Sequence, residues 1–371
     1  MDEDEKLNRF QEAFERGQEG QVSDFDTWLR DQGIDSSKID TEFLADFFRE
    51  HPGKAVNHEN QIEEVAEYIG FFSRRSNVYH LPVIGVSGIG KTQFLHTVAD
   101  LLGEIEPDIE QWLYHADDFS ERGDEEERIF EVRDELRGIK KVVIYVDDCE
   151  WERAESLVES FRVIESVVDD AFLLTSWTPE YWKHHREEFE DVFPVSREVH
   201  LSAFAEADCV EAVKQVFTVV ADDGVETPEA HLEKIHEYSG GVPGVFTELA
   251  VESLRETYLK ELELGSVEAV EAAAEKLKLV DVEESVYGLS DTKLTILTHM
   301  LLWNHRDGIR PSELVDLIDR DKSTVSYHLS DLKSEGLVES EKRGRSAYYR
   351  VKDLVKPFVQ NGIDQAAEYH G

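Results

Sequence analysis

The sequence contains very little cysteine. Cys149 and Cys209 are the only two in 371 residues, with no C-x-x-C pair and no cluster of histidine and cysteine at metal-ligand spacing. Structural zinc sites need such clusters, and proteins of reducing compartments use cysteine sparingly. We therefore expect a protein of a reducing interior that has no structural zinc.

Long apolar runs are also absent. No stretch approaches the 18 residues of a membrane-spanning helix, and Met1–Glu5 has neither the positive charge nor the apolar core that begins a signal peptide. These absences predict a cytoplasmic protein with no membrane partner.

Basic residues are scarce relative to acidic ones. Lysine and arginine total 39 against 82 acids, a formal charge of -43, yet 40% of the residues are apolar. The chain can therefore bury real cores and is not an acidic tail. The composition resembles that of proteins from salt-accumulating haloarchaea, in which molar salt screens the self-repulsion of an acidic surface. An ordinary acidic protein remains the alternative.

Residues 85–92 complete the phosphate-loop pattern G-x-x-x-x-G-K-[ST]. An apolar run, residues 80–84, precedes the pattern and an amphipathic stretch follows it, so the loop joins a buried strand to a helix. In this setting Lys91 reaches the β- and γ-phosphates of ATP, and the Thr92 hydroxyl ligates Mg²⁺. The alternative is a glycine turn with an incidental lysine. The expected nucleotide-binding residues of the loop are Gly85, Ser87, Gly88, Ile89, Gly90, Lys91, Thr92 and Gln93.

A second apolar run, residues 141–146, leads into Asp147 and Asp148. A strand over residues 142–146 would place both carboxylates at its carboxyl end, which is the usual ligand side of an α/β sheet. We expect Asp147 to hold Mg²⁺ through water and Asp148 to orient or deprotonate the attacking water. Paired acids after a strand also serve as turn and cap residues.

The next strand, expected over residues 172–175, is closed by Ser176. If it neighbours the phosphate-loop strand, the Thr175 and Ser176 hydroxyls lie beside the γ-phosphate, and Ser176 joins Asp148 and Lys91 as a catalytic residue. The alternative is an N-cap for a helix over residues 179–190.

The rest of the first 285 residues alternates between strand and helix patterns. Further strands are expected at 112–114 and 198–201, helices at 129–136 and 151–168, and a solvated acidic loop at 117–128. Before residue 51, short helices are expected at 7–14, 25–29 and 43–48, with Trp28 and the phenylalanines forming a small core. We expect four regions: residues 1–50, a phosphate-loop domain 51–202, a helical lid and connector 203–285, and a carboxy-terminal domain 286–371.

The carboxy-terminal third resembles a winged helix-turn-helix. Three helices, opening near Ser290, at Pro311 and after residue 322, precede two strands at 337–340 and 347–351. Residues 320–350 carry seven basic and five acidic side chains, a net of +2 in a strongly acidic chain. DNA contact is expected, and a module that binds only protein is the alternative. The expected DNA-binding residues are Lys322, Ser323, Thr324, Tyr327, His328, Arg343 and Arg345.

Together these motifs resemble the STAND class of signalling ATPases. That resemblance implies a helical lid whose Gly241-Val242-Pro243 motif places Pro243 near the nucleotide, and a degraded upstream motif containing His58. The alternative for residues 240–244 is a helix end and turn that makes no nucleotide contact. Archaeal origin-recognition initiators of the AAA+ class share the layout but are expected to have glutamate in place of Asp148.

The fold class expected is α/β: a P-loop NTPase parallel sheet with a helical lid, plus an α+β winged-helix domain. The function expected is a slow ATPase switch that couples ATP and Mg²⁺ to DNA binding, as a transcriptional regulator. The alternatives are a replication or plasmid-maintenance initiator and a sensor whose winged helix binds only protein. A homo-oligomer is expected in the ATP state, and Arg186 and Arg197 lie where an arginine could act on a neighbouring copy.

Overall fold

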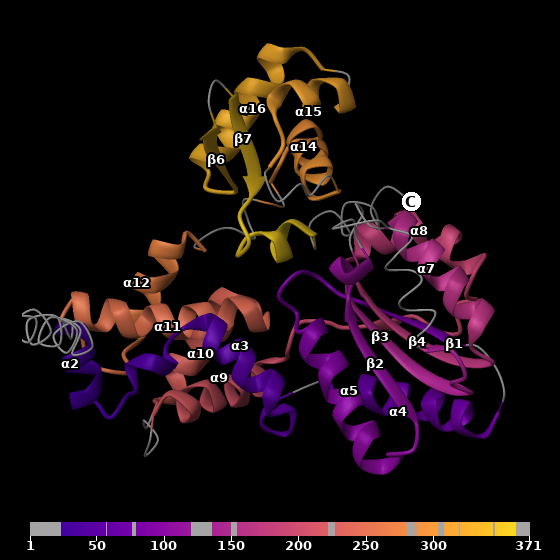
Figure 1. The fold of residues 1–371 in the computed structure, drawn as a ribbon. Coiled ribbons are helices and arrows are strands. Elements are labelled where there is room, and N and C mark those ends of the chain that lie inside the picture. Colours follow the sequence, from indigo (N-terminus) through magenta and orange to yellow (C-terminus); the bar gives the residue numbers. More distant parts are fainter. Residues whose placement is uncertain are drawn as a thin grey trace, which may run out of the picture.

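The computed structural model describes most of the chain after residue 23. The described residues are 24–56, 58–75, 79–119, 136–149, 154–221, 227–279, 286, 288–302, 308–318, 320–343 and 346–360. They form a sheet domain, a helical lid beside it, and a winged-helix domain that lies above both in Figure 1. Within these residues no helix is long and apolar enough to cross a membrane.

The sheet domain is built on parallel strands. The described strands are β1 (Tyr79–Ile84), β2 (Glu110–His115), β3 (Lys141–Cys149), β4 (Asp170–Trp177) and β5 (Val199–His200). Their order is β2-β3-β4-β1-β5, with every neighbouring pair parallel. The strand that ends near Ser176 therefore lies directly beside the phosphate-loop strand, as the expectation for Ser176 required.

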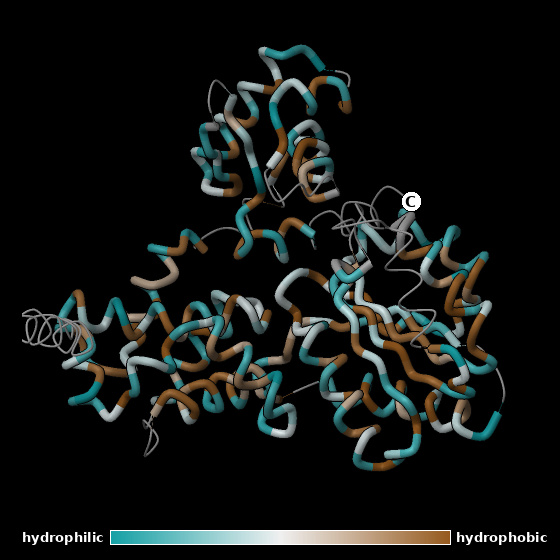
Figure 2. The backbone as a smooth tube through the Cα atoms, viewed as in Figure 1, coloured by the Kyte–Doolittle hydropathy of each residue, from teal (hydrophilic) through white to brown (hydrophobic). Residues whose placement is uncertain are grey.

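Helices cover both faces of this sheet, as the alternating strand–helix pattern predicts. Helices α4 (Glu59–Arg74) and α5 (Lys91–Ile105) pack on one face, and α7 (Ala154–Val167) and α8 (Pro179–Glu190) on the other. Along β3, Val143 and Tyr145 face the first pair while Ile144 faces the second, because successive side chains of a strand point to opposite faces. Figure 2 shows the resulting hydrophobic strands between more polar helices.

The third strand extends beyond its expected end at Val146. It continues to Cys149, so Asp147 and Asp148 lie inside the strand instead of after it. Pairing with β4 shifts between Val146 and Cys149, where Asp148 has a φ of 56°. A bulge of this kind lets one residue leave the ladder while pairing resumes beyond it. Aspartate tolerates the left-handed region better than most side chains do.

Two other expectations concern neighbouring segments. The helix over 129–136 and the acidic loop over 117–128 lie outside the described residues, apart from 117–119 and the buried Leu136. Helix α8 has the expected bounds, but its N-cap is Thr178, with no side-chain cap hydrogen bond, so neither Thr175 nor Ser176 caps it.

The lid is a bundle of helices on the far side of the phosphate loop. Its described helices are α9 (Glu206–Val220), α10 (Glu229–Ser239), α11 (Pro243–Leu259) and α12 (Val267–Leu277). They share one apolar core with the first described segments of the chain. The helices among those segments that contribute to this core are α2 (Asp24–Asp31) and α3 (Thr41–Glu50). The short helix η1 (Ser36–Lys38) lies between them, and η2 (Pro52–Lys54) follows α3 and packs on α5.

The expectation of a separate amino-terminal core is wrong for the described part of that region. Leu29 and Leu44 are fully buried within the lid core, and Trp28 packs against Tyr258 of α11. The backbone N–H of Asp35 donates to the Val220 carbonyl at 2.8 Å. The helix expected over 7–14 lies outside the described residues.

The winged-helix domain follows the expected element order. It comprises α14 (Asp291–Leu302), α15 (Pro311–Ile318), α16 (Lys322–Ser334), β6 (Val338–Arg343) and β7 (Ser346–Val351). The antiparallel hairpin β6–β7 gains a third line of pairing from the bridge between Ile309 and Tyr349. The core of this domain also contains Val355 and Val359, from a segment (residues 352–360) that follows the wing.

Candidate functional site

The phosphate loop curls between β1 and α5. Gly88 and Gly90 have φ values of 76° and 98°, which only glycine adopts without strain, and Gly90 is the residue before α5 begins at Lys91. The loop backbone therefore passes directly into a helix amino terminus, where N–H groups and the helix dipole favour an anion. This geometry suits a phosphate group.

The loop's lysine is folded back over the loop itself. Lys91 Nζ donates to the carbonyl oxygens of Gly85 at 2.8 Å and Val86 at 3.1 Å. These carbonyls hold the ammonium at the mouth of the loop, within a side-chain rotation of the space above it. The expected contact of Lys91 with the β- and γ-phosphates stays a prediction.

Asp147 lies at the centre of a hydrogen-bonded cluster beneath the loop. Its Oδ2 accepts from Thr92 Oγ1 at 2.6 Å, and its Oδ1 accepts from Ser176 Oγ at 2.5 Å. Asp147 is only 8% exposed, so this carboxylate is held by two hydroxyls in a largely desolvated position. Residues from α5, β3 and β4 meet here because the carboxyl ends of neighbouring parallel strands share one edge.

This cluster fits a magnesium ion. Mg²⁺ prefers oxygen ligands and is usually held by one or two carboxylates together with substrate phosphates and water, not by an all-protein cage. Thr92 and Asp147 supply such oxygens, and no group of three or more His, Cys, Asp or Glu side chains suited to a metal occurs among the described residues. The donor set therefore matches Mg²⁺ better than zinc or another soft metal.

The neighbouring hydroxyl, Thr175, does not belong to the site. Its side chain is fully buried and its Oγ1 accepts from Trp177 Nε1 at 2.6 Å, inside the core. Only Ser176 reaches the cluster, where its Oγ also accepts from the Asp148 backbone N–H at 2.8 Å. Alternation along β4 separates the two side chains, and the expectation for Thr175 was wrong for that reason.

Asp148 points into the cavity from the bulge in β3. Its left-handed backbone directs the carboxylate away from the sheet, with Oδ2 at 3.5 Å from His115 Nε2 at the end of β2. Sequence reasoning did not select His115, because a single histidine at a strand end carries no spacing signal. Both side chains line the same cavity as the phosphate loop.

The lid closes onto the loop through glycine. Gly240 ends α10 with a φ of 58°, and Pro243 opens α11 at a position where the missing N–H is harmless. The Gly244 N–H donates to the Gly88 carbonyl at 2.9 Å, and a Cβ on Gly244 would lie 3.2 Å from Gly88 Cα. The local turn expected for residues 240–244 is present, and it brings Pro243 to the cavity wall.

Sheet domain, lid and amino-terminal helices enclose a cavity of about 550 Å³. Cavities of roughly 300–1,000 Å³ hold cofactor-sized ligands. Its lining includes the phosphate loop and the two aspartates, and also apolar side chains, among them Leu44, Phe48, Val216 and Phe204. A lining that combines phosphate-binding groups with apolar side chains suits a phosphorylated ligand that also has a flat, weakly polar group.

His58 and Gln93 border the cavity through backbone contacts. His58 is 8% exposed, and burial lowers the pKa of its imidazole. Its Nε2 lies 3.2 Å from the Ile89 carbonyl, so the neutral ring must carry its proton on that nitrogen. Gln93 Nε2 donates to the Phe48 carbonyl at 2.7 Å, which ties the start of α5 to α3.

One occupant of the loop was not expected from sequence. The Ser87 backbone N–H donates to Gln360 Oε1 at 2.8 Å, and Gln360 Nε2 donates to Glu180 Oε2 at 3.2 Å. Gln360 is 3% exposed and comes from the segment that follows the wing. No motif or periodicity marks an isolated glutamine 273 residues away from its partner.

The expected DNA-binding helix is present and partly exposed. Asp321 caps α16, accepting from the backbone N–H groups of Ser323 and Thr324, and both hydroxyls also donate to its carboxylate, Thr324 Oγ1 at 2.6 Å. These hydrogen bonds hold the pKa of Asp321 well below its usual value. Tyr327 is 66% exposed, and the ring of the half-buried His328 lies edge-on to it at 5.3 Å.

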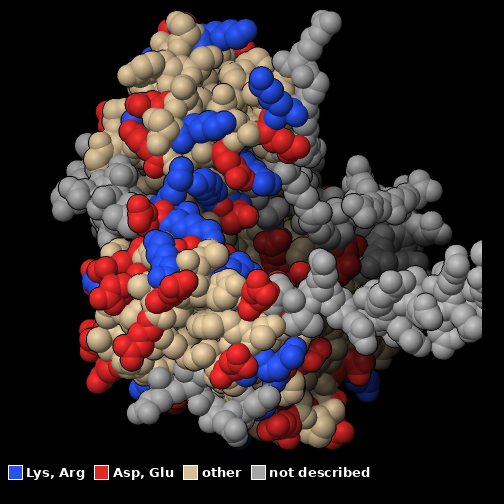
Figure 3. Space-filling view, turned by 90° about the vertical axis from the view of Figure 1, so that its left-hand side faces the viewer, with Lys and Arg blue, Asp and Glu red and all other residues tan. Residues whose placement is uncertain are grey.

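Of the remaining residues expected to bind DNA, the structure describes only some. Lys322 is exposed at the start of α16, whereas the Arg343 side chain and Arg345 lie outside the described residues. Figure 3 shows one side of the molecule. On this side, lysine and arginine side chains gather over the upper half, across the winged-helix domain and its junction with the lid, whereas acidic side chains dominate the lower half.

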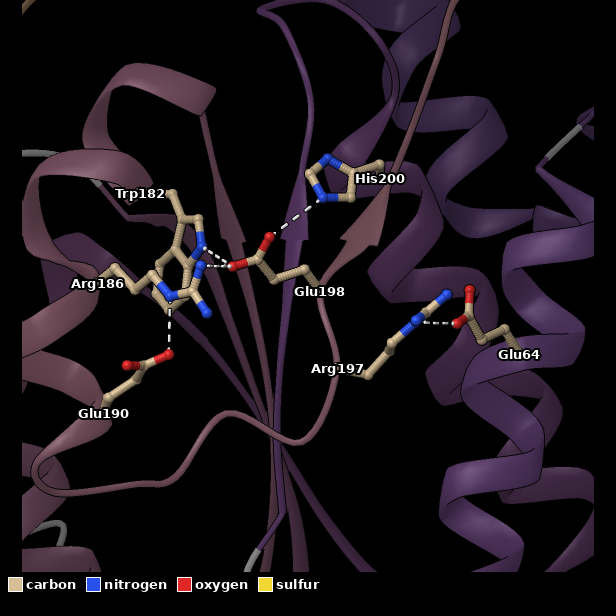
Figure 4. Close-up of polar contacts among 7 residues, drawn as sticks. All are labelled: Glu64, Trp182, Arg186, Glu190, Arg197, Glu198 and His200. Atoms are coloured by element: carbon tan, nitrogen blue, oxygen red, sulfur yellow. Dashed lines mark hydrogen bonds and ion pairs between the residues drawn. The ribbon is translucent and has the colours of Figure 1, made fainter. Parts of the chain in front are cut away.

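Arg186 and Arg197 are engaged with carboxylates on the sheet domain, as Figure 4 shows. Arg186 pairs with Glu190 at 2.8 Å and Glu198 at 3.0 Å, while Arg197 pairs with Glu64 at 2.7 Å. Both arginine side chains are at least half exposed, so these pairs contribute little to stability and exchange readily.

Comparison with known proteins places the carboxy-terminal domain most clearly. Residues 309–340 match the family model described as bacterial regulatory protein, arsR family. Over 66 residues, 18% of this chain, the sequence is 35% identical to the cadmium resistance transcriptional regulatory protein CadC of Listeria innocua and, equally, to that of Lactococcus lactis subsp. lactis. The match covers 54% of each relative, so the chain spans about half the length of the curated relatives it matches.

The whole fold resembles that of a solved structure. The ORC1 protein of Aeropyrum pernix, solved in complex with DNA, aligns with a TM-score of 0.50 at 14% identity, over 85% of this chain and 94% of that one. At this identity the likeness establishes fold alone. It confirms the expected α/β class, a P-loop sheet domain followed by a helix-turn-helix domain.

Proposed function

We propose that this protein is an ATP- and Mg²⁺-dependent molecular switch whose nucleotide state controls DNA binding by its winged helix. The observation that carries the proposal is the cluster in which Thr92 and Ser176 both donate to Asp147 beneath the phosphate loop. It joins a metal-suited carboxylate to a phosphate-suited loop in a chain that also carries an arsR-type DNA-binding motif.

The residues of the cavity have separate tasks in this proposal. The loop from Gly85 to Gly90 and Lys91 would bind the phosphates, and Pro243 would approach the nucleotide from the lid. Thr92 and Asp147 would hold Mg²⁺, which supplies charge neutralisation to the phosphates when bound. Asp148 would orient the attacking water, because its side chain lines the same cavity as the phosphate loop.

Slow hydrolysis fits this arrangement better than rapid turnover. The carboxylate that would orient the water lies on a bulge and is half exposed. Such a group is less firmly held than one fixed by packing, and a 1 Å displacement is costly in catalysis. A slow ATPase is suited to timing a switch.

We further propose that the protein is a transcriptional regulator. The arsR-family match supports this assignment because it falls on the helix-turn-helix, at residues 309–340. The two similar CadC proteins, which are named transcriptional regulatory proteins, support it as well. Lys322, Tyr327 and His328 on α16 are then candidates for the major groove, and Arg343 and Arg345 on the wing for phosphates.

A replication or plasmid-maintenance initiator is the second candidate. The order of sheet domain, lid and winged helix resembles the ORC1 fold along most of both chains. A STAND-type sensor whose winged helix binds only protein is the third. The acidic composition supports a haloarchaeal type of protein. The boundaries near residues 202 and 285 stand as proposed domain boundaries, and the described part of residues 1–50 is grouped with the lid, whose core it shares.

DNA binding in molar KCl, with and without ATP·Mg²⁺, tests the central proposal. We expect ATP to change the affinity of the wild type and to have no effect on Lys91→Ala. If the wild type binds no DNA with any nucleotide, the remaining candidate is the sensor whose winged helix binds only protein. Footprints on the chain's own promoter support a regulator, and footprints on a replication origin support an initiator.

Assembly in the ATP state is part of the same proposal. Arg186 and Arg197 are exposed on the sheet domain, where either could reach the nucleotide of a neighbouring copy once freed from its carboxylates. Light scattering with a non-hydrolysable ATP analogue should then show a higher mass than the nucleotide-free protein. Arg186→Ala and Arg197→Ala test the two arginines separately.

A further inference from the structure

The segment that follows the wing contacts each part of the molecule. Val355 and Val359 are fully buried in the winged-helix core, and Phe358 packs against both that core and the lid. Phe358 lies close to Gly240, at 3.7 Å from the position of an added Cβ. Gln360 then reaches the phosphate loop.

Gln360 contacts the loop in the way that a phosphate oxygen would. A carboxamide oxygen accepts a hydrogen bond from a backbone N–H as a phosphate oxygen does, and the two cannot occupy the same N–H together. The orientation of the amide is fixed, because its nitrogen faces the Glu180 carboxylate and its oxygen faces the Ser87 N–H. Reversing it would set a donor against a donor and an oxygen against an oxygen.

We propose that Gln360 is an internal ligand of the phosphate loop, which competes with nucleotide for the Ser87 N–H and thereby holds the winged-helix domain docked while the loop is empty. This inference rests on the proposed function in requiring that the cavity bind a nucleotide. It adds the element by which occupancy of the cavity is communicated to the winged helix.

The route of communication is short. Nucleotide displaces Gln360, and Val355 and Val359 on the same segment belong to the winged-helix core, so the segment and that domain move together. A second tether, from Tyr181 Oη to the Leu301 carbonyl at 2.6 Å, joins α8 to the end of α14 and must also open. By linkage, whatever releases the domain favours nucleotide by the same factor.

The test is nucleotide affinity in the full-length chain. Gln360→Ala and the similarly sized Gln360→Leu remove the competing acceptor, so both should bind an ATP analogue about fivefold more tightly than the wild type, the equivalent of one net hydrogen bond. Gln61→Ala is the matched control. Its side-chain amide also makes a hydrogen bond to the backbone of a distant segment, donating to the His200 carbonyl at 3.3 Å, but it does not line the cavity.

Small-angle X-ray scattering gives a second, independent measure. The wild type should expand when the analogue is added, whereas Gln360→Ala should already be expanded without it. Equal affinity in wild type and both Gln360 variants, or weaker binding in the variants, would overturn the competition while leaving the proposed function intact. A wild type that binds no nucleotide would overturn both. Melting curves confirm that the variants are folded.

Discussion

At the residue scale, the Asp147 carboxylate is held by hydrogen bonds at both of its oxygens. Both of its oxygens accept from hydroxyls on other elements, and it is almost fully buried. Removing a buried carboxylate that accepts two hydrogen bonds lowers the free energy of unfolding, because the two hydroxyls are left without an acceptor. The residue therefore supports the local structure as well as any metal.

Asp147→Ala should weaken Mg²⁺-dependent nucleotide binding. The substitution removes the metal-suited oxygen and leaves the Thr92 and Ser176 hydroxyls without their acceptor. Titration of a fluorescent ATP analogue with and without Mg²⁺ measures the effect. A variant whose affinity keeps the full Mg²⁺ dependence of the wild type would show that the metal is held elsewhere.

Asp148→Asn should bind ATP normally and hydrolyse it about a hundredfold more slowly, in the range of a lost general base. The amide keeps the size of the side chain but cannot take a proton, so the loss belongs to the transition state. Phosphate release at saturating ATP gives the rate. If Asp148→Asn and Asp147→Ala lose binding equally, the two roles are misassigned.

Lys91→Ala should abolish nucleotide binding without unfolding the chain. The ammonium donates to the Gly85 and Val86 carbonyls of the loop and is not part of the apolar core clusters, so its loss should leave those cores intact. Calorimetric titration and a melting curve on the same sample separate the two effects. Unchanged ATP affinity in a folded variant would remove the phosphate-loop assignment.

The sequence pointed to those candidate site residues that belong to a local pattern. The phosphate loop is contiguous, and Asp147 and Ser176 stand near the ends of apolar runs, so strand topology alone brings them together. Gln360 and His115 were missed for a common reason. Each contacts its partner only because distant segments pack together. A single polar residue of this kind belongs to no motif, so the sequence does not mark it as a site residue.

At the element scale, α16 is fixed at its start by a single side chain. Asp321 accepts from two backbone N–H groups and from the hydroxyls of Ser323 and Thr324. Those hydroxyls are thus already used in the free protein. Base contact by either would exchange one hydrogen bond for another, which leaves Tyr327 and Lys322 as the freer groups on this face.

Asp321→Ala should lower the melting temperature of the winged-helix domain by a few degrees, because the helix loses its cap. The pKa of the carboxyl is lowered in the folded state from its ordinary 3.8, so the contribution is fully present above that value and is lost as pH falls below it. The gap between the melting curves of wild type and variant should therefore narrow as the pH falls below 3.8, and it should close only once the pH passes the lowered pKa of the folded state. A gap that does not narrow at all below pH 3.8 would contradict the capping role.

Salt separates the two kinds of DNA contact. Arg343→Ala and Arg345→Ala should weaken binding to every sequence and reduce the log-log salt slope by about one unit each. Tyr327→Ala should reduce discrimination between sites, by about 1–3 kcal/mol for a good base contact, with little change in slope. Binding is measured over a KCl series on cognate and scrambled duplexes. No effect from any of the three would favour a protein-binding winged helix.

Element boundaries followed from sequence where a cap or proline marks them. Pro179, Pro311 and Gly336 each stand where a helix begins or has just ended. The end of β3 was misplaced because the apolar run stops at Val146 while backbone pairing resumes at Cys149. A bulge is a property of the ladder, and side-chain patterns do not report it.

At the scale of the whole molecule, charge dominates. With a formal charge of -43, the folded chain repels itself at low ionic strength, and molar salt reduces the Debye length to about 3 Å. Urea unfolding should therefore show higher stability in molar KCl than in about 0.1 M KCl. Equal midpoints at the two salt concentrations would contradict a haloarchaeal type of surface.

The packing of the amino-terminal segments on the lid was beyond sequence. The sequence pattern around Leu29 and Leu44 is the same whether these side chains form a separate core or pack into one made by α9 and α11. Such a pattern predicts which side chains are buried, but it does not predict the segment against which they pack. The distinction arises only when several segments compete for the same surface.

The burial of Val355 and Val359 inside the winged-helix core bears on how the protein is divided for experiment. A fragment cut at Val351, where the wing ends, would leave two buried valine positions vacant, and each lost methyl-rich side chain costs roughly 1–3 kcal/mol in a small domain. Such a fragment would aggregate or misfold and would give a false negative for DNA recognition. A fragment retaining residues through 360 keeps that core whole, and it also frees Gln360 from the sheet domain, so it should behave as a permanently released form.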